Sequence, residues 1–498
     1  MNDLILKIKE AVDDLKSSLL NKPKPRRNNR QRAIRERKTG RNAYRTESTS
    51  KNLLKKFKNN KKAIIIIAAV VLFIGLIGIY NLMQDMDLRA RNYCIMKLSP
   101  DSSYYIVVGY EGDKTTIEIP SEYKGKPVKA IGAWAFDHVQ HEVTSIIIPD
   151  SVTRIGEGAF EWKIYLTDVI IGSSVVDIGN YAFRECSSLK NVTFNNNNSL
   201  ENIGNEAFYH TQIEEIDIPD TVKSIGWCAF AHCTSLKEIA LPEHAENFGG
   251  STFVGCLSLT KVKIPSTYTS VPDSAFKNCS ALTDVYISNS VKQIGSSAFE
   301  GCTSLKNVIF EENSQLETIS YSAFLNTGIE SIELPNSVKT IFRHAFQDCT
   351  SLTEINIPDS VTTIDDEAFM GCTALTSIVI PNGVTVLENG MFTGCTSLTS
   401  VALPKNLIGF AGTVFDGCTS LTSVTIPESV TYIGYQSFNG CTSLESIFIP
   451  ESVTDIYDHA FTNCDNLTIY CAATSKPKDW YNNWNSSNCE VVWGYVSE

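Results

Sequence analysis

Apolar residues between positions 131 and 464 recur with a period of about 23 residues, and polar residues separate them in a fixed order. In one unit Leu352, Ile355 and Ile357 mark a short strand whose alternate residues point inward. Pro358 then ends the strand, because proline cannot donate a hydrogen bond to a sheet. The most regular position is a phenylalanine, which occurs fifteen times at intervals of 22 to 25 residues: Phe136, Phe160, Phe183, Phe208, Phe230, Phe253, Phe276, Phe299, Phe324, Phe346, Phe369, Phe392, Phe415, Phe438 and Phe461.

This periodicity predicts a solenoid. One unit is too small to enclose its own apolar side chains, whereas stacked units bury them between neighbours in a continuous core. We expect about fifteen units over residues 131–464. They should form a curved stack with a parallel β-sheet on one face and turns or short helices on the other. Two units are longer than the rest and carry inserts at 195–198 and 311–314.

The pattern Leu-x-x-Ile-x-Ile-Pro-x-x-Val-x-x-Ile-Gly-x-x-Ala-Phe with a closing Cys resembles the BspA-type leucine-rich-repeat family over about 80% of the chain. Residues 104–110, 119–128 and 466–495 resemble the opening and closing segments of such proteins. The resemblance implies a leucine-rich-repeat solenoid with a linker and N-terminal cap at 84–130 and a C-terminal cap at 465–498. It also implies a surface protein used for adhesion and for contact with a host or matrix.

An apolar run at 63–83 contains 21 residues and no charged side chain. As a helix it would span roughly 30 Å, the hydrocarbon thickness of a bilayer. A buried core helix, the alternative, is normally shorter. Because 62 residues precede the run, a cleaved signal peptide does not fit, and we expect a single transmembrane helix that acts as an uncleaved signal anchor. Lysines at its entrance place the N-terminus in the cytoplasm and the repeat domain outside the cell membrane.

Charge is divided unevenly along the chain. Residues 1–62 contain 20 Lys and Arg against 6 Asp and Glu, so they carry about +14 and the remainder about −26. We predict a disordered basic linker at 21–62, and contact between Lys55 to Lys62 and anionic lipid headgroups. A nucleic-acid partner is not expected, because aromatic residues do not alternate with the basic ones. A short amphipathic helix is predicted within 1–20, with an apolar face made of Leu4, Ile5, Ile8, Val12, Leu15 and Leu19.

Fifteen cysteines raise the question of metal binding or disulfides. Eleven of them occupy one slot of the repeat, which predicts a column of buried thiols that behave as small apolar groups. Thr211 and Thr327 replace cysteine in two units. Outside the slot, Cys471 and Cys489 both fall in the C-terminal cap, which makes a disulfide between them a candidate. No metal is expected, because closely paired zinc ligands such as Cys-x-x-Cys are absent from the sequence.

No catalytic set stands out in the sequence. His138, His141 and Glu142 lie close together, but their order does not match the metalloprotease motifs, so we interpret this segment as a loop. The sequence has no glycine-rich phosphate loop after a strand and no nucleophile elbow. We therefore expect neither enzyme activity nor a cofactor.

The residue between the two inward-pointing positions of each strand faces solvent. Large apolar groups at these outward positions are informative, because a solvated strand does not need them. The alternative is that they only stabilise packing between neighbouring strands. We predict ligand contacts at six outward positions: Lys263, Tyr286, Ile309, Glu333, Val379 and Phe448.

Two functions remain open from the sequence. One is an adhesin-like or receptor-like module that binds an extracellular protein or glycan. The other is a structural envelope scaffold that tethers components of the same cell. No feature of the sequence identifies the ligand.

Overall fold

The structure is a computed structural model, and it describes residues 93–245 and 247–496. The predictions for residues 1–92 lie outside this range, including the amphipathic helix, the basic linker and the transmembrane segment 63–83. In the described part of the chain, no helix is long and apolar enough to cross a membrane. The described residues all belong to one compact unit, Asp87–Glu498.

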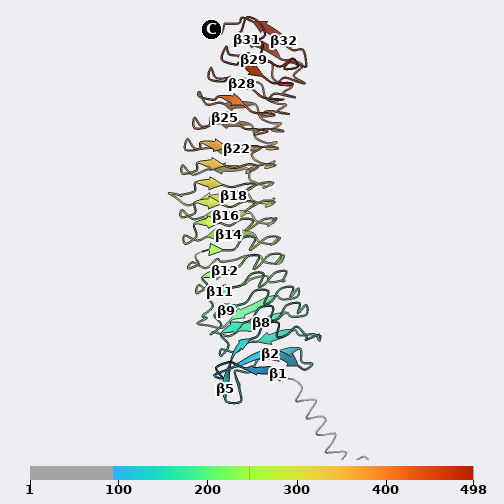
Figure 1. The fold of residues 1–498 in the computed structure, drawn as a ribbon, viewed down its shortest axis with the longest axis vertical. Coiled ribbons are helices and arrows are strands. Elements are labelled where there is room, and N and C mark those ends of the chain that lie inside the picture. The colour runs from blue at the N-terminus through green and yellow to red at the C-terminus, as the bar shows by residue number, and fades with distance from the viewer. Residues whose placement is uncertain (1–92, 246, 497–498) are drawn as a thin grey trace, which may run out of the picture. The chain divides into compact units, whose positions relative to one another are not determined.

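This unit is a stack of coils that bends gently along its length, with β1 and β2 at one end and β31 and β32 at the other (Figure 1). β1 (Tyr93–Leu98) pairs antiparallel with β2 (Tyr105–Glu111), and β2 runs parallel to β5 (Lys126–Ile131). β4 (Glu122–Tyr123) folds back antiparallel on β5, and β3 (Thr116–Glu118) runs parallel to the next strand of the stack. These strands cover the first coil of the solenoid.

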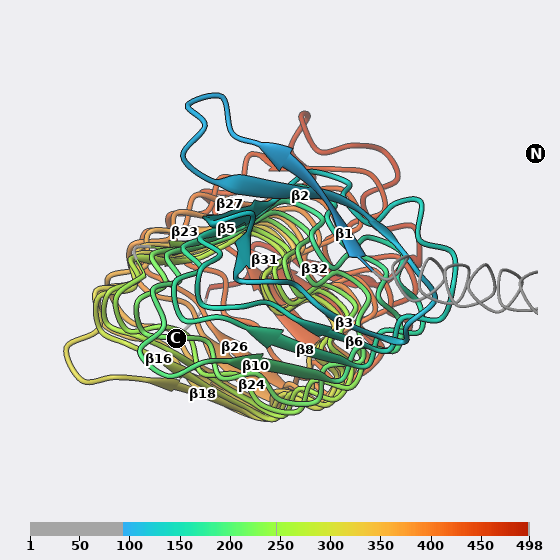
Figure 2. The same cartoon turned by 90° about the horizontal axis from the view of Figure 1, so that it is seen from below.

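The first column of parallel strands, called the strand face from here on, runs along one side of the stack (Figure 2). Burial alternates along its strands: Val285 and Ile287 are buried, whereas Tyr286 between them is exposed. The predicted parallel sheet is present, but in the described residues it is divided into five short sheets. Two of the breaks coincide with the inserts at 195–198 and 311–314. Sheet by sheet, the strands after β3 are β6 (Ser145–Ile147), β8 (Asp168–Ile171) and β10 (Asn191–Phe194); β14 (Lys261–Ile264), β16 (Asp284–Ile287) and β18 (Asn307–Phe310); β20 (Ser331–Glu333) and β22 (Glu354–Asn356); β24 (Ser377–Val379) and β26 (Ser400–Ala402); and β29 (Ser446–Ile449), β31 (Thr468–Cys471) and β32 (Glu490–Trp493).

A second column of parallel strands, each only two residues long, lies on another side of the coils. The short helices expected opposite the strand face are not found in the described residues, where strands and turns take their place. The coils approach closely just after these strands: a Cβ on Gly156 would lie 2.6 Å from the backbone nitrogen of Ala133. The strands of this column are β7 (Arg154–Ile155), β9 (Asp177–Ile178), β11 (Asn202–Ile203), β12 (Ser224–Ile225), β13 (Asn247–Phe248), β15 (Ser270–Val271), β17 (Gln293–Ile294), β19 (Thr318–Ile319), β21 (Thr340–Ile341), β23 (Thr363–Ile364), β25 (Val386–Leu387), β27 (Gly409–Phe410), β28 (Tyr432–Ile433) and β30 (Asp455–Ile456).

The turns that run from each strand of the second column to the next strand of the strand face form a third side, called the turn side. It contains the fifteen repeated phenylalanines, called the phenylalanine column. From Phe136 to Phe461, consecutive ring centroids lie 4.7 to 5.7 Å apart without interruption. Tyr110 stacks on the first ring at 6.2 Å, and Trp484 lies edge-on to the last at 5.9 Å. The predicted continuous core is confirmed, and an aromatic side chain closes each end of the column.

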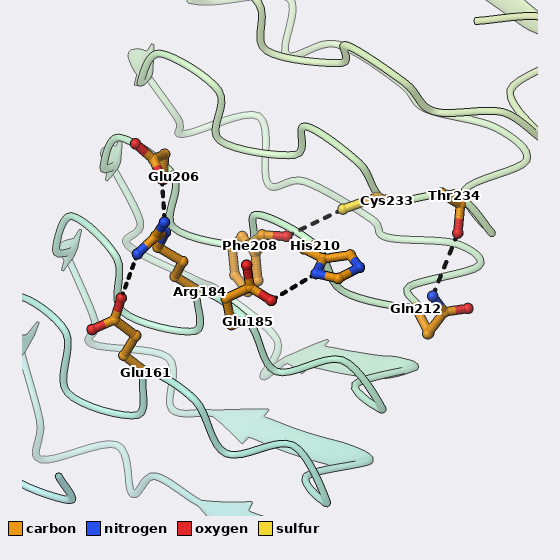
Figure 3. Close-up of polar contacts among 9 residues, drawn as sticks. All are labelled: Glu161, Arg184, Glu185, Glu206, Phe208, His210, Gln212, Cys233 and Thr234. Atoms are coloured by element: carbon orange, nitrogen blue, oxygen red, sulfur yellow. Dashed lines mark hydrogen bonds and ion pairs between the residues drawn. The ribbon is translucent and has the colours of Figure 1, made fainter.

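The eleven cysteines of the repeat slot are all buried beside this column, as predicted. They make polar as well as apolar contacts. Each thiol donates a hydrogen bond to the carbonyl oxygen of a phenylalanine in the preceding coil, with Sγ to O distances of 2.9 to 3.3 Å. Figure 3 shows one such pair, Cys233 and Phe208. Burial raises the pKa of the Cys279 thiol to about 12, so the donor proton stays in place.

Two threonines show how the slot adapts when cysteine is absent. The hydroxyl of Thr211 lies 3.2 Å from the thiol of Cys233, and the hydroxyl of Thr327 lies 3.2 Å from the thiol of Cys349. Both threonines are buried. A hydroxyl therefore fits the slot when it has a hydrogen-bond partner.

The turn after each phenylalanine explains the recurring Gly-Cys pair. Two residues after the phenylalanine, the backbone is left-handed, with φ of +73° at Gly371 and +71° at Gly440. Glycine adopts this conformation without steric cost, and asparagine tolerates it, as at Asn278 with φ of +60°. The same left-handed position recurs in fourteen of the fifteen coils, all except that of Phe136.

The C-terminal segment extends the strand face by β31 and β32 and buries Trp480 and Trp484 against the last coils. The disulfide proposed between Cys471 and Cys489 is not formed, since both thiols are free. Cys471 pairs in register with Trp493, four residues beyond Cys489. The thiol of Cys489 instead donates a hydrogen bond to the carbonyl oxygen of Cys464 at 3.3 Å.

Candidate binding surface on the strand face

Three of the six predicted contact residues lie side by side on the strand face. Lys263 of β14 is the register partner of Tyr286 of β16, and Tyr286 is the partner of Ile309 of β18. Tyr286 is 41% exposed and Ile309 44% exposed, and both flank strand residues that are buried or half-buried. Adjacent strands hold these side chains about 4.8 Å apart on a rigid support.

A hollow of about 300 Å³ opens where these strands end, and we call it the strand-face hollow. All three aligned residues line it. Its remaining polar residues come from the loops after the strands and from the preceding coil: Glu243, Ser266, Ser288 and Glu311. The loop that follows β18 projects beyond its neighbours in both overall views (Figures 1 and 2). This loop contains the insert 311–314, so the insert helps to form the hollow.

Hydrogen bonds and charges fix the rim of the strand-face hollow. The backbone nitrogen of Asn289 donates to Glu311 Oε2 at 3.0 Å, which holds that carboxylate in place. Lys263 Nζ lies 3.6 Å from Glu243 Oε1, and both side chains are more than half exposed. Water screens an exposed pair of this kind, so it orients the two groups more than it stabilises the fold.

The lining of the strand-face hollow combines apolar and charged groups. An aromatic ring and an aliphatic side chain provide apolar contact, and one ammonium group and two carboxylates surround them. Ser288 already donates its hydroxyl to the carbonyl of Pro265 at 2.9 Å. In residues 93–245 and 247–496, no group of three or more His, Cys, Asp or Glu is arranged to hold a metal ion.

The other three predicted contacts lie elsewhere on the strand face. Glu333 of β20 is exposed and pairs in register with Asn356, one sheet beyond the hollow. Val379 of β24 is 67% exposed, further along the stack. Phe448 is half-buried, because the ring of Tyr495 from the C-terminal segment lies edge-on to it at 6.0 Å. The structure therefore brings together only Lys263, Tyr286 and Ile309.

Sequence reasoning missed the polar residues that line the hollow from outside the strands. Glu311 had a visible signal, since it begins one of the two inserts. Glu243 lies where the repeat pattern becomes irregular, which also distinguishes it from ordinary loop residues. Ser266 and Ser288 had no signal, because serine is common in the turns of this chain.

The repeats match a known family. Overlapping segments at 113–226, 201–317, 269–397, 317–418 and 362–482 match the profile of the BspA type leucine-rich repeat region. The chain belongs to this family. The resemblance expected from the sequence is thus confirmed over most of the chain.

Solved structures of leucine-rich-repeat proteins are similar to this chain. A leucine-rich repeat protein from Bacteroides ovatus is 29% identical, with a TM-score of 0.65, over 81% of this chain and 98% of that one. A leucine-rich cell surface protein from Faecalibacterium prausnitzii is 27% identical, with a TM-score of 0.45, over 81% of this chain and 96% of that one. No curated protein matches the chain.

Proposed function

We propose that this BspA-type protein is anchored in the cell membrane and binds an extracellular protein or glycan through the strand-face hollow. The observation that carries the proposal is the alignment of Tyr286 and Ile309, two exposed apolar side chains, at a hollow of about 300 Å³. Membership of a family of solenoids supports the proposal, because stacked coils repeat one outward position at regular spacing. The uncharged run at 63–83 supports the anchor.

The position and exposure of Tyr286 and Ile309 favour a role in ligand contact over a role in stabilising the fold. Neither side chain belongs to the buried core, so the fold gains little from their size. An exposed aromatic beside an aliphatic group, with charges at the rim, is a common arrangement at the centre of protein interfaces. The ligand we propose therefore has an apolar patch surrounded by hydroxyl or amide groups.

The test uses cells that carry the full chain, with binding measured on arrays of matrix proteins and glycans. Replacing Tyr286 and Ile309 together by serine should weaken binding by about 1 to 4 kcal/mol. Val379→Ser is the matched control, since it removes a more exposed apolar side chain outside the hollow and should leave binding unchanged. If the double variant folds and binds like the parent, the proposed site is wrong.

The same cells test the anchor and the scaffold alternative. External protease should remove the repeat domain and leave a tag at residue 1 intact, whereas loss of the tag would contradict the proposed orientation. Partners that come only from the same cell would favour an envelope scaffold over adhesion.

A further inference from the structure

One coil near the N-terminal end departs from the repeat at four consecutive positions. Most coils place glycine, asparagine or aspartate two residues after the phenylalanine, then cysteine, then small polar residues, as in Gly440-Cys441-Thr442-Ser443. After Phe160 the chain instead reads Trp162-Lys163-Ile164-Tyr165. Lys163 therefore occupies the slot that holds a cysteine in eleven other coils.

The fold does not require the large side chains of this coil. Trp162 has left-handed backbone with φ of +60°, a conformation that costs a large residue more than glycine. Trp162, Ile164 and Tyr165 are 56%, 44% and 48% exposed. Three neighbouring apolar side chains in solvent, where most other coils carry small polar ones, point to a partner.

Lys163, which lies among these exposed residues in the sequence, is only 9% exposed. Its Nζ donates one hydrogen bond to the carbonyl oxygen of Val139 at 3.2 Å, and burial lowers the pKa of its ammonium group. Glu161, the nearest acidic residue in sequence, is instead engaged by Arg184, which also reaches Glu206 (Figure 3). Among the described residues, no carboxylate lies within ion-pair distance of Lys163.

A hollow of about 270 Å³ connects these features, and we call it the turn-side hollow. Trp162, Lys163, Ile164 and Tyr165 line one side of it. The preceding turn lines the other side with Asp137, Val139, Gln140, His141 and Val143. The position of His141 is fixed, since its Nε2 lies 2.9 Å from the carbonyl oxygen of Lys114 and its ring centroid lies 5.9 Å from that of Tyr110.

We propose that the turn-side hollow binds one carboxylate-bearing six-membered ring, with the carboxylate at Lys163 and the ring against Trp162 and Tyr165. Asp137 and Glu161 act on the charge of Lys163 but lie beyond ion-pair distance. A buried ammonium group without a direct carboxylate contact favours an anion, and it has two further N–H groups to donate. The exposed aromatic residues offer flat apolar walls, and Asp137 and Gln140 can bond the hydroxyl groups of the ring. The small volume limits the ligand to a single ring.

Two sources supply this chemistry, a uronic acid of a glycan and an aromatic carboxylic acid. The full-length protein is titrated with methyl glucuronide, benzoate and the neutral methyl glucoside, with tryptophan fluorescence and ligand NMR as readouts. Binding of methyl glucuronide at least about tenfold tighter than of methyl glucoside supports the proposal and a glycan source. Preference for benzoate supports it with an aromatic acid as the source. If neither carboxylate binds, the proposal is wrong.

Variants that restore the repeat pattern separate binding from folding. Lys163→Cys rebuilds the thiol slot and should keep or raise the melting temperature while weakening carboxylate binding at least about tenfold. Trp162→Gly should relieve the left-handed backbone and also weaken binding. Asn278→Gly makes the equivalent change in a coil without a hollow and is the matched control. Equal carboxylate affinity in the parent and in Lys163→Cys would overturn the assignment. This inference concerns a different site and does not depend on the strand-face proposal.

Discussion

The turn side and the strand face share one period, yet they differ in how far their residues vary. On the turn side, phenylalanine fills its slot in fifteen coils and cysteine fills another in eleven. On the strand face, the outward position holds lysine, tyrosine and isoleucine in three successive coils, at Lys263, Tyr286 and Ile309.

Contacts between coils explain the difference. Each phenylalanine ring between the first and the last packs against the phenylalanine rings of the coils before and after it. Each thiol of the repeat slot donates a hydrogen bond to the preceding coil. A change on the turn side is therefore felt by several coils. An outward residue on the strand face meets solvent, so its identity is free to serve a ligand. In this solenoid, repetition marks what the fold needs, and variation marks where function can reside.

Alkaline pH should have the largest effect on the turn side, because it acts on all eleven thiols of the repeat slot together. Burial raises their pKa above the ordinary value of 9.0, to about 12 for Cys279 and Cys395. The unfolded chain therefore releases protons above about pH 9 while the folded chain keeps them, so the free energy of unfolding falls as pH rises. At one unit above the unfolded pKa the loss is about 1.4 kcal/mol per thiol and on the order of 10 kcal/mol for the column.

Urea unfolding at neutral pH and near pH 10 measures this effect, and the midpoint should drop steeply between them. As a control, a thiol reagent applied to the folded protein near pH 9 should leave the thiols of the repeat slot unmodified until denaturant is added. A midpoint that does not change, or rapid labelling of the folded protein, would contradict the buried thiol column.

A single phenylalanine in the middle of the column tests how much ring packing contributes to the free energy of unfolding. Phe346→Ala removes a fully buried ring that stacks on both neighbours, and it should lower the free energy of unfolding by about 3 to 5 kcal/mol. Tyr286→Ser on the strand face removes a ring of similar size and should change it by less than about 0.5 kcal/mol. Similar losses for both variants in thermal and urea unfolding would remove the distinction between the two sides.

The smallest expected effect concerns the hydrogen bond of one thiol. Cys372→Ala removes the bond to the carbonyl of Phe346 and leaves a small cavity, so we expect a loss of about 1 to 3 kcal/mol. Cys372→Thr should cost less than about 1 kcal/mol, because Thr327 occupies the same slot in another coil. If alanine is tolerated as well as threonine, the thiol acts only as an apolar group.

Part of the surface was predictable from the sequence and part was not. The outward position of Tyr286 and Ile309 follows from the alternation of inward and outward residues along a strand. Their grouping with Glu243 and Glu311 depends on how loops of neighbouring coils meet, which alternation does not encode. Phe448 looked equivalent in the sequence, yet Tyr495 partly covers it.

The period, the inward-facing residues and the column of buried thiols could be predicted from the amino-acid sequence, because each is a local pattern repeated many times. The second column of strands, the thiol to carbonyl bonds and the free state of Cys471 and Cys489 became evident only from the folded chain. Those features depend on the register between adjacent coils. A repeat specifies what each coil buries, whereas close approach of the backbones, as at Gly156, fixes which atoms of neighbouring coils meet.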